Sequence, residues 1–448
     1  MKRKMNLIRK LIILLCLASI GILVCSCKKD DTVVPAATST PSSDSGNKEE
    51  TGIELPAEYD NEIWTKKFWE NDISYYEPIS FTEDETGQLV VGNLFYEPEE
   101  ILEVRSGVGF AQLYKDKDFA YEDGKFNVTS TILLVEGRDY TVKNGKIRLT
   151  SDKKYIDVMT YEELYPFYKE GEEKTWLALP SDNSRYINID GTIKNAQIYV
   201  TYTHKDSWSG YVPAAQTEHL PATMSKLENK EALNFVIYGD SIATGADCSG
   251  NTERVIDVNT LKEVSYNSNT APKTPSWAEM VTARLETLYG YDGIVKINRA
   301  AGSSESSWGA KNVQTLLCSD DNKIPDVVVI AFGMNEPGRT GTAFKANLNT
   351  MIDTVLAKNP NCEFILMSSI ESNPMYGPTN LSEHEKAMYE LQNERTDVHI
   401  AVCPVNSVYH GMLDEGKTFY DLTSNNINHP NDFLGRVYAM TLLATLGK

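Results

Sequence analysis

The sequence predicts an α/β fold, in which helices cover both faces of a parallel sheet, preceded by an all-β sandwich of the jelly-roll sort. Beyond residue 227, short apolar runs alternate with amphipathic segments, the pattern of strands and helices that form a parallel sheet. Before it, short strand-like runs are separated by Asn-Gly and Asp-Gly turns, as in sandwiches. The chain has 448 residues, too many for one ordinary domain.

In the second half, the expected strands share a short, mostly apolar composition: residues 233–238, 294–297, 326–332, 363–367 and 398–402. The run at 326–332 is nearly all apolar, as a strand buried on both faces requires. Between these runs, apolar residues recur at helical spacing from Trp277 and from Phe344, and residues 433–446 form a closing helix. We therefore expect one α/β domain over residues 226–448.

The β-rich half is expected to span residues 56–225. Residues 140–143 and 146–149 flank Asn144-Gly145, the two-residue signature of a hairpin, and residues 196–203 contain alternating apolar and polar residues. Its start is rich in aromatic residues: Trp64, Phe68, Trp69, Tyr75 and Tyr76. We interpret them as core and packing residues, because large aromatic side chains are usually buried. The alternative is an exposed platform on which sugar rings stack.

The first 27 residues are expected to direct export. A basic start precedes the apolar run Leu11 to Val24, which is too short to span a bilayer comfortably. Val24-Cys25-Ser26-Cys27 resembles a bacterial lipobox, which implies a lipid on Cys27 and a protein anchored to a membrane at the bacterial cell surface or in the periplasm. The alternative is an ordinary cleaved signal. Residues 28–55, rich in Ser, Thr, Pro and acidic residues, are expected to form a disordered linker.

Composition excludes several classes of function. The net charge of −20 argues against a nucleic-acid partner, because phosphates require a basic surface. The four cysteines beyond the signal are far apart in sequence and form no Cys-x-x-Cys pair: Cys248, Cys318, Cys362 and Cys403. With no His-Glu-x-x-His sequence either, we expect no metal, no cofactor, and mostly free structural thiols.

Four polar blocks follow the predicted strands or precede the last helix. Gly239-Asp240-Ser241-Ile242 ends the first strand, Asn298 to Gly302 ends the second, and Gly333-Met334-Asn335-Glu336 follows the third. Asn428-His429-Pro430 precedes the closing helix. In order and setting, these blocks resemble those of the SGNH (GDSL-type) ester hydrolases, named for a Ser, a Gly, an Asn and a His. The resemblance covers about half of the chain, from Asn234 onward, and implies a three-layer SGNH-like domain.

The resemblance also implies roles for single residues. Ser241 is expected to be the nucleophile and His429 the base that takes its proton, because a serine hydroxyl needs an adjacent base. The oxyanion is expected to be held by the backbone N–H groups of Ser241 and Gly302 and by the side chain of Asn335. Glu336 stands where the family more often has aspartate.

One position departs from the family's pattern. The last block is usually written Asp-x-x-His, but three residues before His429 the chain has Asn426. An amide cannot stabilise an imidazolium as a carboxylate does. We therefore predict a Ser-His dyad, with His429 oriented by the Asn426 side chain or by a backbone carbonyl. Asp421 is the alternative acid, although its spacing does not match the motif.

Together these features predict a serine esterase that forms an acyl-enzyme. A β-sandwich ahead of such a domain is similar to the arrangement in bacterial carbohydrate esterases, which implies an O-acetylated polysaccharide or oligosaccharide as substrate. Two alternatives remain at this stage. One is a lipase or thioesterase of the same fold, and the other is a glycan-binding surface lipoprotein whose hydrolase domain is inactive.

Overall fold

A computed structural model describes residues 60–106, 132–143, 145–153, 156–189, 192–268, 270 and 272–448. The predicted signal and linker (residues 1–55) and the proposed lipid site Cys27 lie outside these ranges. The described residues from Asp60 onward form one compact unit. No helix among them is both long enough and apolar enough to cross a membrane.

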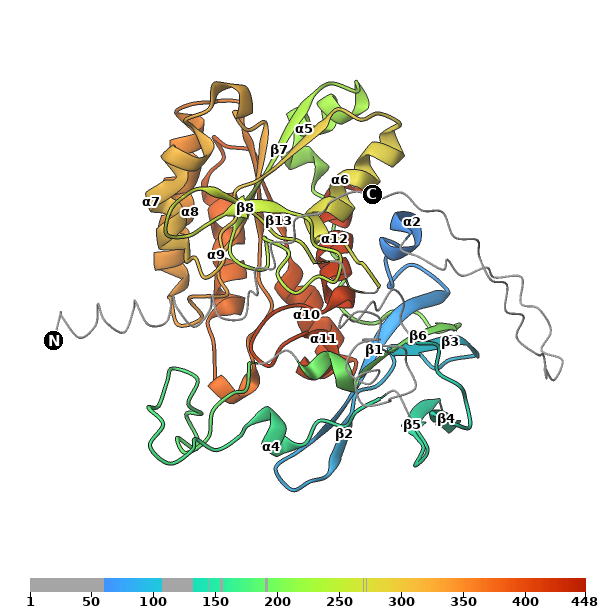
Figure 1. The fold of residues 1–448 in the computed structure, drawn as a ribbon. Coiled ribbons are helices and arrows are strands. Elements are labelled where there is room, and N and C mark those ends of the chain that lie inside the picture. The colour runs from blue at the N-terminus through green and yellow to red at the C-terminus, as the bar shows by residue number, and fades with distance from the viewer. Residues whose placement is uncertain are drawn as a thin grey trace, which may run out of the picture. The chain divides into compact units, whose positions relative to one another are not determined.

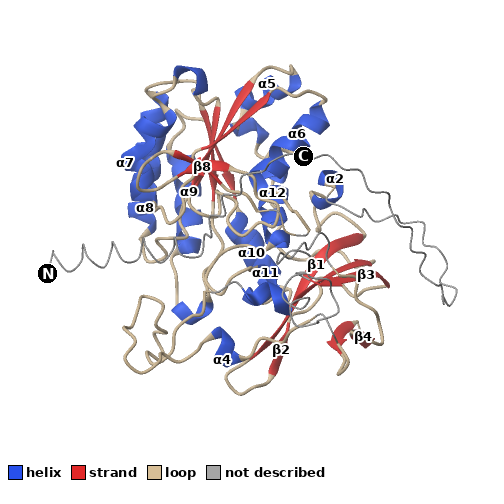
Figure 2. Cartoon of the chain, viewed as in Figure 1, coloured by secondary structure: helices blue, strands red, loops and turns tan. Residues whose placement is uncertain are grey.

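A five-stranded parallel sheet is the centre of the second half (Figure 2). Its strands, in spatial order, are β10 (Ile294–Asn298), β7 (Leu233–Gly239), β11 (Val327–Ala331), β12 (Glu363–Met367) and β13 (Ile400–Cys403). Numbered along the chain, this order is 2-1-3-4-5, a doubly wound arrangement. Such sheets bind ligands at the carboxyl ends of their strands, where the order reverses beside the first strand.

Helices cover both faces of this sheet (Figure 1). The helices on one face share a large apolar core with the sheet: α7 (Ser306–Leu317), α8 (Gly341–Leu356) and α9 (Leu381–Glu394). The helices on the other face are α5 (Pro221–Glu228), α6 (Trp277–Tyr289) and α12 (Asp432–Thr445). Helix α10 (Val405–Asp414) contacts α9 and α12, and the short α11 (Phe419–Leu422) precedes the loop before α12. The predicted three-layer α/β domain is confirmed.

The helix boundaries follow from local sequence. Ser276 caps α6 by accepting a hydrogen bond from the Glu279 N–H, and Gly290 ends that helix in the left-handed conformation, with φ of 64°. Thr340 and Asn431 cap α8 and α12 in the same way as Ser276. Smaller elements connect the main ones: β8 (Arg254–Ile256), β9 (Glu263–Ser265), and the 3-10 turns η2 (Thr217–His219), η3 (Asp321–Lys323) and η4 (Pro374–Tyr376).

The first half is β-rich, as predicted. A four-stranded antiparallel sheet has the order β2 (Leu89–Val91), β1 (Ile73–Glu83), β6 (Gln197–Thr203) and β3 (Glu100–Ser106). The predicted hairpin forms as β4 (Tyr140–Lys143) and β5 (Lys146–Leu149), with Lys143 opposite Lys146. The remaining elements are α2 (Asn61–Trp64), α4 (Tyr161–Leu164) and the 3-10 turn η1 (Thr192–Ala196).

The aromatic residues at the start of this half are core residues. All five are buried, so the interpretation as packing residues holds and the exposed sugar platform does not form there. Phe68 packs on Phe433 of α12, with ring centroids 6.1 Å apart. The Arg436 side chain, also from α12, donates to the backbone oxygens of Trp64 and Tyr75. These contacts fix the β-rich half against the last helix.

A buried ion pair joins the two halves. Lys417, just before α11, lies 2.6 Å from the Glu77 carboxylate of β1, and both side chains are 0% exposed. The ammonium also donates to the Pro78 backbone oxygen at 2.7 Å, and the Tyr202 hydroxyl donates to Glu77 at 2.6 Å. Every charge in this cluster therefore has a partner, as burial demands.

Replacing Lys417 by methionine is expected to destabilise the protein by about 3–5 kcal/mol, because Glu77 would be left buried without its counter-ion. Urea denaturation measures the loss of unfolding free energy. The matched control is Lys205→Met, because Lys205 pairs with Glu99 on the surface, where such pairs contribute little. An equal and small loss in both variants would contradict this account of the buried pair.

Candidate active site

Ser241 follows directly from β7. The strand ends at Gly239, where a Cβ atom would lie 2.3 Å from the backbone oxygen of Ala331 on the neighbouring strand. Only glycine allows β7 and β11 to approach this closely before the chain turns. Asp240 and Ser241 then form the turn, and the Ser241 side chain is almost buried at the carboxyl edge of the sheet.

The structure brings Ser241 and His429 together, although 188 residues separate them. The Ser241 Oγ and the His429 Nε2 are 2.9 Å apart, a hydrogen-bond distance. On the other side of the ring, the His429 Nδ1 is 2.9 Å from the Asp247 Oδ2. The three side chains therefore form a continuous Ser–His–Asp line, the arrangement in which a carboxylate orients an imidazole beside a hydroxyl.

The prediction that the Asn426 side chain orients His429 is wrong. This side chain is buried and turned away from the imidazole: its Nδ2 donates to the Leu164 backbone oxygen at 2.8 Å, and its Oδ1 accepts from Asn373. The alternative acid Asp421 is also occupied elsewhere, because its Oδ1 accepts hydrogen bonds from Ser80 of β1. The predicted Ser-His dyad without a carboxylate is therefore also wrong, because the Asp247 carboxylate contacts the His429 ring.

Asp247 has an unusual backbone. Its φ is 64°, in the left-handed region that a non-glycine residue seldom adopts. Its Oδ2 accepts from the Ser424 Oγ at 2.8 Å and the Asn425 Nδ2 at 3.0 Å, in addition to its contact with His429. Burial raises the pKa of Asp247, but His429 and the hydrogen bonds outweigh it, so the pKa lies well below its usual range. The group is a carboxylate at neutral pH.

Asn425 organises the loop that carries His429. Its Oδ1 accepts hydrogen bonds from the backbone N–H groups of Ile427, Asn428 and His429, at 2.9 to 3.1 Å. Its Nδ2 donates to Asp247, so one side chain holds both the loop and the acid. Sequence reasoning missed Asn425 and Asp247. The one signal in the sequence is that Asp247 lies six residues after Ser241, near the same turn, and this spacing alone does not distinguish it from Asp240.

The charges around His429 favour its protonated form. Burial lowers the pKa of the imidazole, but the Asp247 carboxylate and its hydrogen bond raise it by more, with a further contribution from Asp240. The pKa of His429 therefore lies above the ordinary histidine value of 6.5. Burial also raises the pKa of Asp240 to about 7, although it accepts hydrogen bonds from Ile242 and Met334.

This shift predicts the pH dependence of any reaction in which His429 acts as a base. Only the neutral imidazole can accept a proton, so the rate is expected to fall as the pH drops through the raised pKa of His429. Measuring kcat/KM against pH should give an acid limb whose midpoint lies above 6.5. A rate that is flat across the histidine range would contradict a base role for His429.

The expected oxyanion donors lie at the ends of the three neighbouring strands β7, β10 and β11. Among the described residues, the backbone N–H groups of Ser241 and Gly302 donate no hydrogen bond to protein. Ser303, next to Gly302, has a left-handed backbone with φ of 61°, and such strained positions often mark functional sites. The Asn335 Nδ2 donates to the Ser304 backbone oxygen at 3.0 Å, and its amide has a second N–H.

Glu336 and Tyr266 complete the surroundings of these donors. The Glu336 carboxylate accepts from the backbone N–H of Ser306 at 2.7 Å, so it ties the block that contains Asn335 to the start of α7. The Tyr266 hydroxyl approaches Gly302 closely, 3.8 Å from the position that a Cβ atom would occupy there. Burial raises the pKa of Tyr266, so it remains a neutral phenol.

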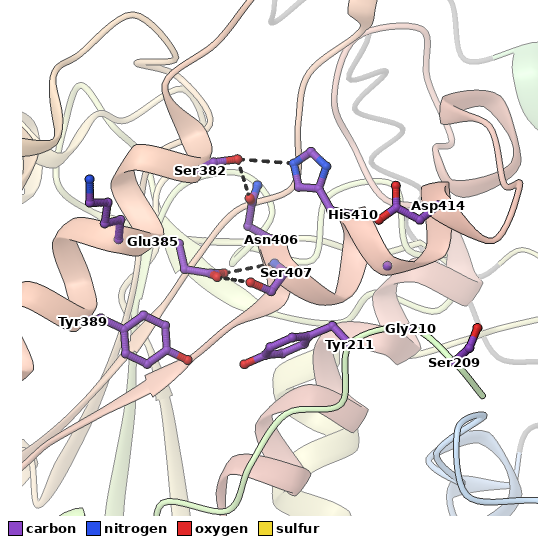
Figure 3. Close-up of a pocket in the computed structure, with 12 residues that line it drawn as sticks. Ser209, Gly210, Tyr211, Ser382, Glu385, Tyr389, Asn406, Ser407, His410 and Asp414 are labelled. Carbon is purple, nitrogen blue, oxygen red and sulfur yellow. Dashed lines mark hydrogen bonds between the residues drawn. The ribbon is translucent and has the colours of Figure 1, made fainter. Parts of the chain in front are cut away.

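A second Ser–His contact lies in a different place, in a hollow of about 600 Å³ between α9, α10 and residues 209–211 (Figure 3). The Ser382 Oγ is 3.3 Å from the His410 Nε2, and the Glu371 carboxylate is 3.3 Å from the same nitrogen. A base needs the serine and the acid on opposite ring nitrogens, so that one is oriented while the other accepts. Ser382 and His410 therefore lack the arrangement present at Ser241.

The four cysteines are buried and free, as expected. Within the described ranges, no group of His, Cys, Asp and Glu side chains is suited to hold a metal ion.

Residues 237–433 match the model of the GDSL-like Lipase/Acylhydrolase family. No curated protein matches the sequence. Among solved structures, the chain is similar to a two-domain esterase (CEX) active on acetylated mannans, with 17% identity and a TM-score of 0.39 over 52% of this chain and 54% of that one. The chain thus spans about half of the length of that esterase.

For two further solved structures, the similar region is about half of this chain and nearly all of the other chain. A variant of Axe2, an acetyl-xylooligosaccharide esterase from Geobacillus Stearmophilus, has 16% identity and a TM-score of 0.35, over 48% of this chain and 94% of that one. A member of the lipolytic protein G-D-S-L family from Veillonella parvula has 16% identity and a TM-score of 0.33, over 47% and 95%.

Proposed function

We propose that this chain, which carries a GDSL-like lipase/acylhydrolase domain over residues 237–433, is a serine esterase with Ser241 as nucleophile. One observation carries the proposal: the unbroken line of contacts from the Ser241 Oγ through His429 to Asp247, with 2.9 Å at each step. A carboxylate on Nδ1 fixes the tautomer whose Nε2 accepts a proton, which is what activates a serine hydroxyl.

In the first half of the reaction, His429 Nε2 takes the proton from the Ser241 hydroxyl while the oxygen attacks the ester carbonyl. The resulting imidazolium faces the ionised Asp247, which offsets its charge. The tetrahedral intermediate then collapses, and His429 passes the same proton to the departing alcohol. An acyl group remains on the Ser241 oxygen.

In the second half, water replaces the alcohol. His429 takes a proton from the water as it attacks the acyl-enzyme, and returns it to the Ser241 oxygen when the carboxylic acid leaves. In both halves, negative charge develops on the carbonyl oxygen. The unpaired N–H groups of Ser241 and Gly302, with the Asn335 amide, are the donors we assign to that charge.

The acyl group that we propose is acetyl. Tyr266 supports a small group, because its hydroxyl lies 3.8 Å from the position that a Cβ atom would have at Gly302 and so takes up room beside a proposed oxyanion donor. A phenol at this position hinders the binding of a long acyl chain more than it hinders the methyl group of an acetyl ester. A lipase or thioesterase of the same fold would need an apolar groove at this point.

The alcohol part that we propose is a carbohydrate. Trp176 is 52% exposed, and its ring is within 7° of parallel to that of Tyr376, 6.4 Å away. Tyr376 lies three residues after Asn373. The backbone N–H of Asn373 donates to the backbone oxygen of Ile427, which lies two residues before His429. An exposed tryptophan ring that stacks on a half-buried tyrosine beside the His429 loop suits the apolar face of a sugar ring.

We also propose that the protein is held on a membrane by a lipid on Cys27, at the bacterial cell surface or in the periplasm. The lipobox-like sequence before Cys27 supports this. Labelling the protein with a radioactive fatty acid tests it, because Cys27→Ala should abolish the label and leave a protein that no longer sediments with membranes.

The function is tested by measuring acid release from three substrates: acetylated xylan, a chromogenic acetate and a chromogenic long-chain ester. The control is the same protein after its nucleophilic serine has been blocked with a fluorophosphonate. We expect acetate release from the first two substrates, its loss after blocking, and a kcat/KM that is higher for the acetate than for the long-chain ester.

Each outcome separates one class of function. A preference for the long-chain ester would favour a lipase. Turnover of the chromogenic acetate without release of acetate from acetylated xylan would remove the carbohydrate assignment. Binding of the folded protein to glycans with no turnover of any ester would overturn the esterase proposal.

A further inference from the structure

The catalytic acid is held by a residue from the β-rich half. Lys194 is the third residue of the 3-10 turn η1 (Thr192–Ala196). Its Nζ donates a hydrogen bond to the backbone oxygen of Asp247 at 2.6 Å. The strand β6 begins directly after η1, so Lys194 is attached to the antiparallel sheet rather than to the hydrolase domain. One side chain therefore connects the β-rich half to the Ser241–His429–Asp247 line.

The backbone of Asp247 needs such support. Its left-handed conformation has φ of 64° and costs free energy for a residue with a side chain. The Asp247 carboxylate is 38% exposed, so packing alone does not fix it. A hydrogen bond from an ammonium to the carbonyl of this residue fixes the peptide plane, and with it the direction in which the carboxylate points.

The same half also holds the loop that carries His429. The Gln197 Nε2, at the start of β6, donates to the backbone oxygens of Tyr420 and Thr423, at 2.6 and 2.7 Å. The Asn426 Nδ2 donates to the Leu164 backbone oxygen. The acid and the base are thus both held from outside the hydrolase domain. Lys194 holds Asp247, and Gln197, three residues further along, holds the segment that leads to the His429 loop.

We propose that Lys194 is a positioning residue for the Asp247 carboxylate, through which the β-rich half sets the geometry of the catalytic line. This inference rests on the proposed esterase function. In this role the β-rich half is a part of the active site's framework and not only a separate module. Lys194 acts through Asp247 and is not assigned any contact with substrate.

The charge of Lys194 also reaches His429. The groups that face His429 are Asp247, Asp240 and Lys194: the two carboxylates raise the pKa of the imidazole, and the ammonium lowers it. Loss of the ammonium charge alone would therefore raise the pKa of His429, whereas displacement of the Asp247 carboxylate, the largest raising influence, would lower it. The direction of the pKa shift thus separates a positioning role for Lys194 from an effect of its charge alone.

The test compares Lys194→Met, Lys194→Arg and the surface control Lys205→Met. For Lys194→Met, we expect kcat on a chromogenic acetate to fall by up to about 10²-fold, the scale of a small misplacement of a catalytic group, with little change in KM. The midpoint of the acid limb should move to lower pH, because a displaced Asp247 carboxylate raises the pKa of His429 less. Lys194→Arg keeps both the charge and a donor, so it should restore most of kcat and the wild-type midpoint.

Three results would overturn the proposal. The first is a Lys194→Met variant with wild-type kcat and midpoint. The second is a loss of kcat or of thermal stability with a midpoint that is unmoved or raised. The third is a Lys205→Met variant that behaves like Lys194→Met. If Lys194→Met does not fold, Lys194→Ala replaces it, because alanine also removes the donor to Asp247. Its midpoint should likewise fall, and an unmoved or raised midpoint overturns the proposal.

A measurement that needs no turnover separates this proposal from the proposed function. Nuclear magnetic resonance can follow the titration of the His429 ring, identified by the signal that disappears in His429→Asn. If the wild-type protein hydrolyses no ester, the esterase proposal fails. A lowered pKa of His429 in Lys194→Met would then still support the positioning of Asp247 by Lys194, and an unchanged or raised pKa would overturn it.

Discussion

Replacing Ser241 by alanine is expected to lower kcat for ester hydrolysis by about 10⁶-fold, the scale of losing the nucleophile in a serine hydrolase. His429 and the oxyanion donors remain in the variant, but no oxygen is left to form the acyl-enzyme. The fold should tolerate the change, because the side-chain partner of the Ser241 Oγ is His429 and no core contact is lost. The measurement is acetate release, with circular dichroism to show that the variant is folded.

Ser382→Ala is the matched control for this substitution. Ser382 also contacts a histidine, His410 at 3.3 Å, with a carboxylate nearby, but both contacts use the same ring nitrogen. The control should therefore retain nearly the wild-type kcat. Loss of activity in Ser382→Ala, with activity preserved in Ser241→Ala, would move the active site to the hollow between α9 and α10.

Replacing Asp247 by asparagine is expected to lower kcat by about 10⁴-fold. The amide can accept from His429 with its oxygen, but it cannot offset the charge of the imidazolium, and its NH₂ group favours the wrong tautomer when it faces the ring. Because three donors converge on the Asp247 Oδ2, the variant must also rearrange Ser424 and Asn425. The measurements are kcat and KM on a chromogenic acetate at a pH above the acid limb.

Asn426→Ala distinguishes the two candidates for the orienting residue. Asn426 is buried among hydrogen bonds to Leu164 and Asn373, so its loss should lower the melting temperature. Its effect on kcat in the folded protein should be far smaller than that of Asp247→Asn. If the order were reversed, the orienter would be Asn426 and the Asp247 contact would have no part in catalysis.

The strands and the residues that follow them could be predicted because the signals are local. The run from 326 to 332 is apolar on both faces, and it becomes the central strand β11. Ser241, Gly302 and Asn335 follow three such runs, so a parallel sheet has to bring them to one edge. The strand pattern therefore placed these three residues together, and the resemblance to the SGNH hydrolases implied their roles as nucleophile and donors.

The partner of His429 could not be predicted in this way. The motif pointed to position 426, but the Asn426 side chain donates to the Leu164 backbone oxygen, in a loop whose backbone N–H groups converge on Asn425. Asp247 reaches His429 across 182 residues because its own backbone takes the left-handed conformation. No local pattern of apolar and polar residues encodes either choice.

By itself, then, the sequence determined the α/β fold and the β-rich half, since these follow from apolar periodicity. The pairing of Ser241 with His429 was implied by the resemblance of the four blocks to those of the SGNH hydrolases. The tertiary structure alone decided that Asp247 is the acid and that Lys194 reaches it from the other half. The physical reason is that strand formation is driven by burial along a short segment, whereas the direction of a loop side chain is set by hydrogen bonds from residues far away in the chain.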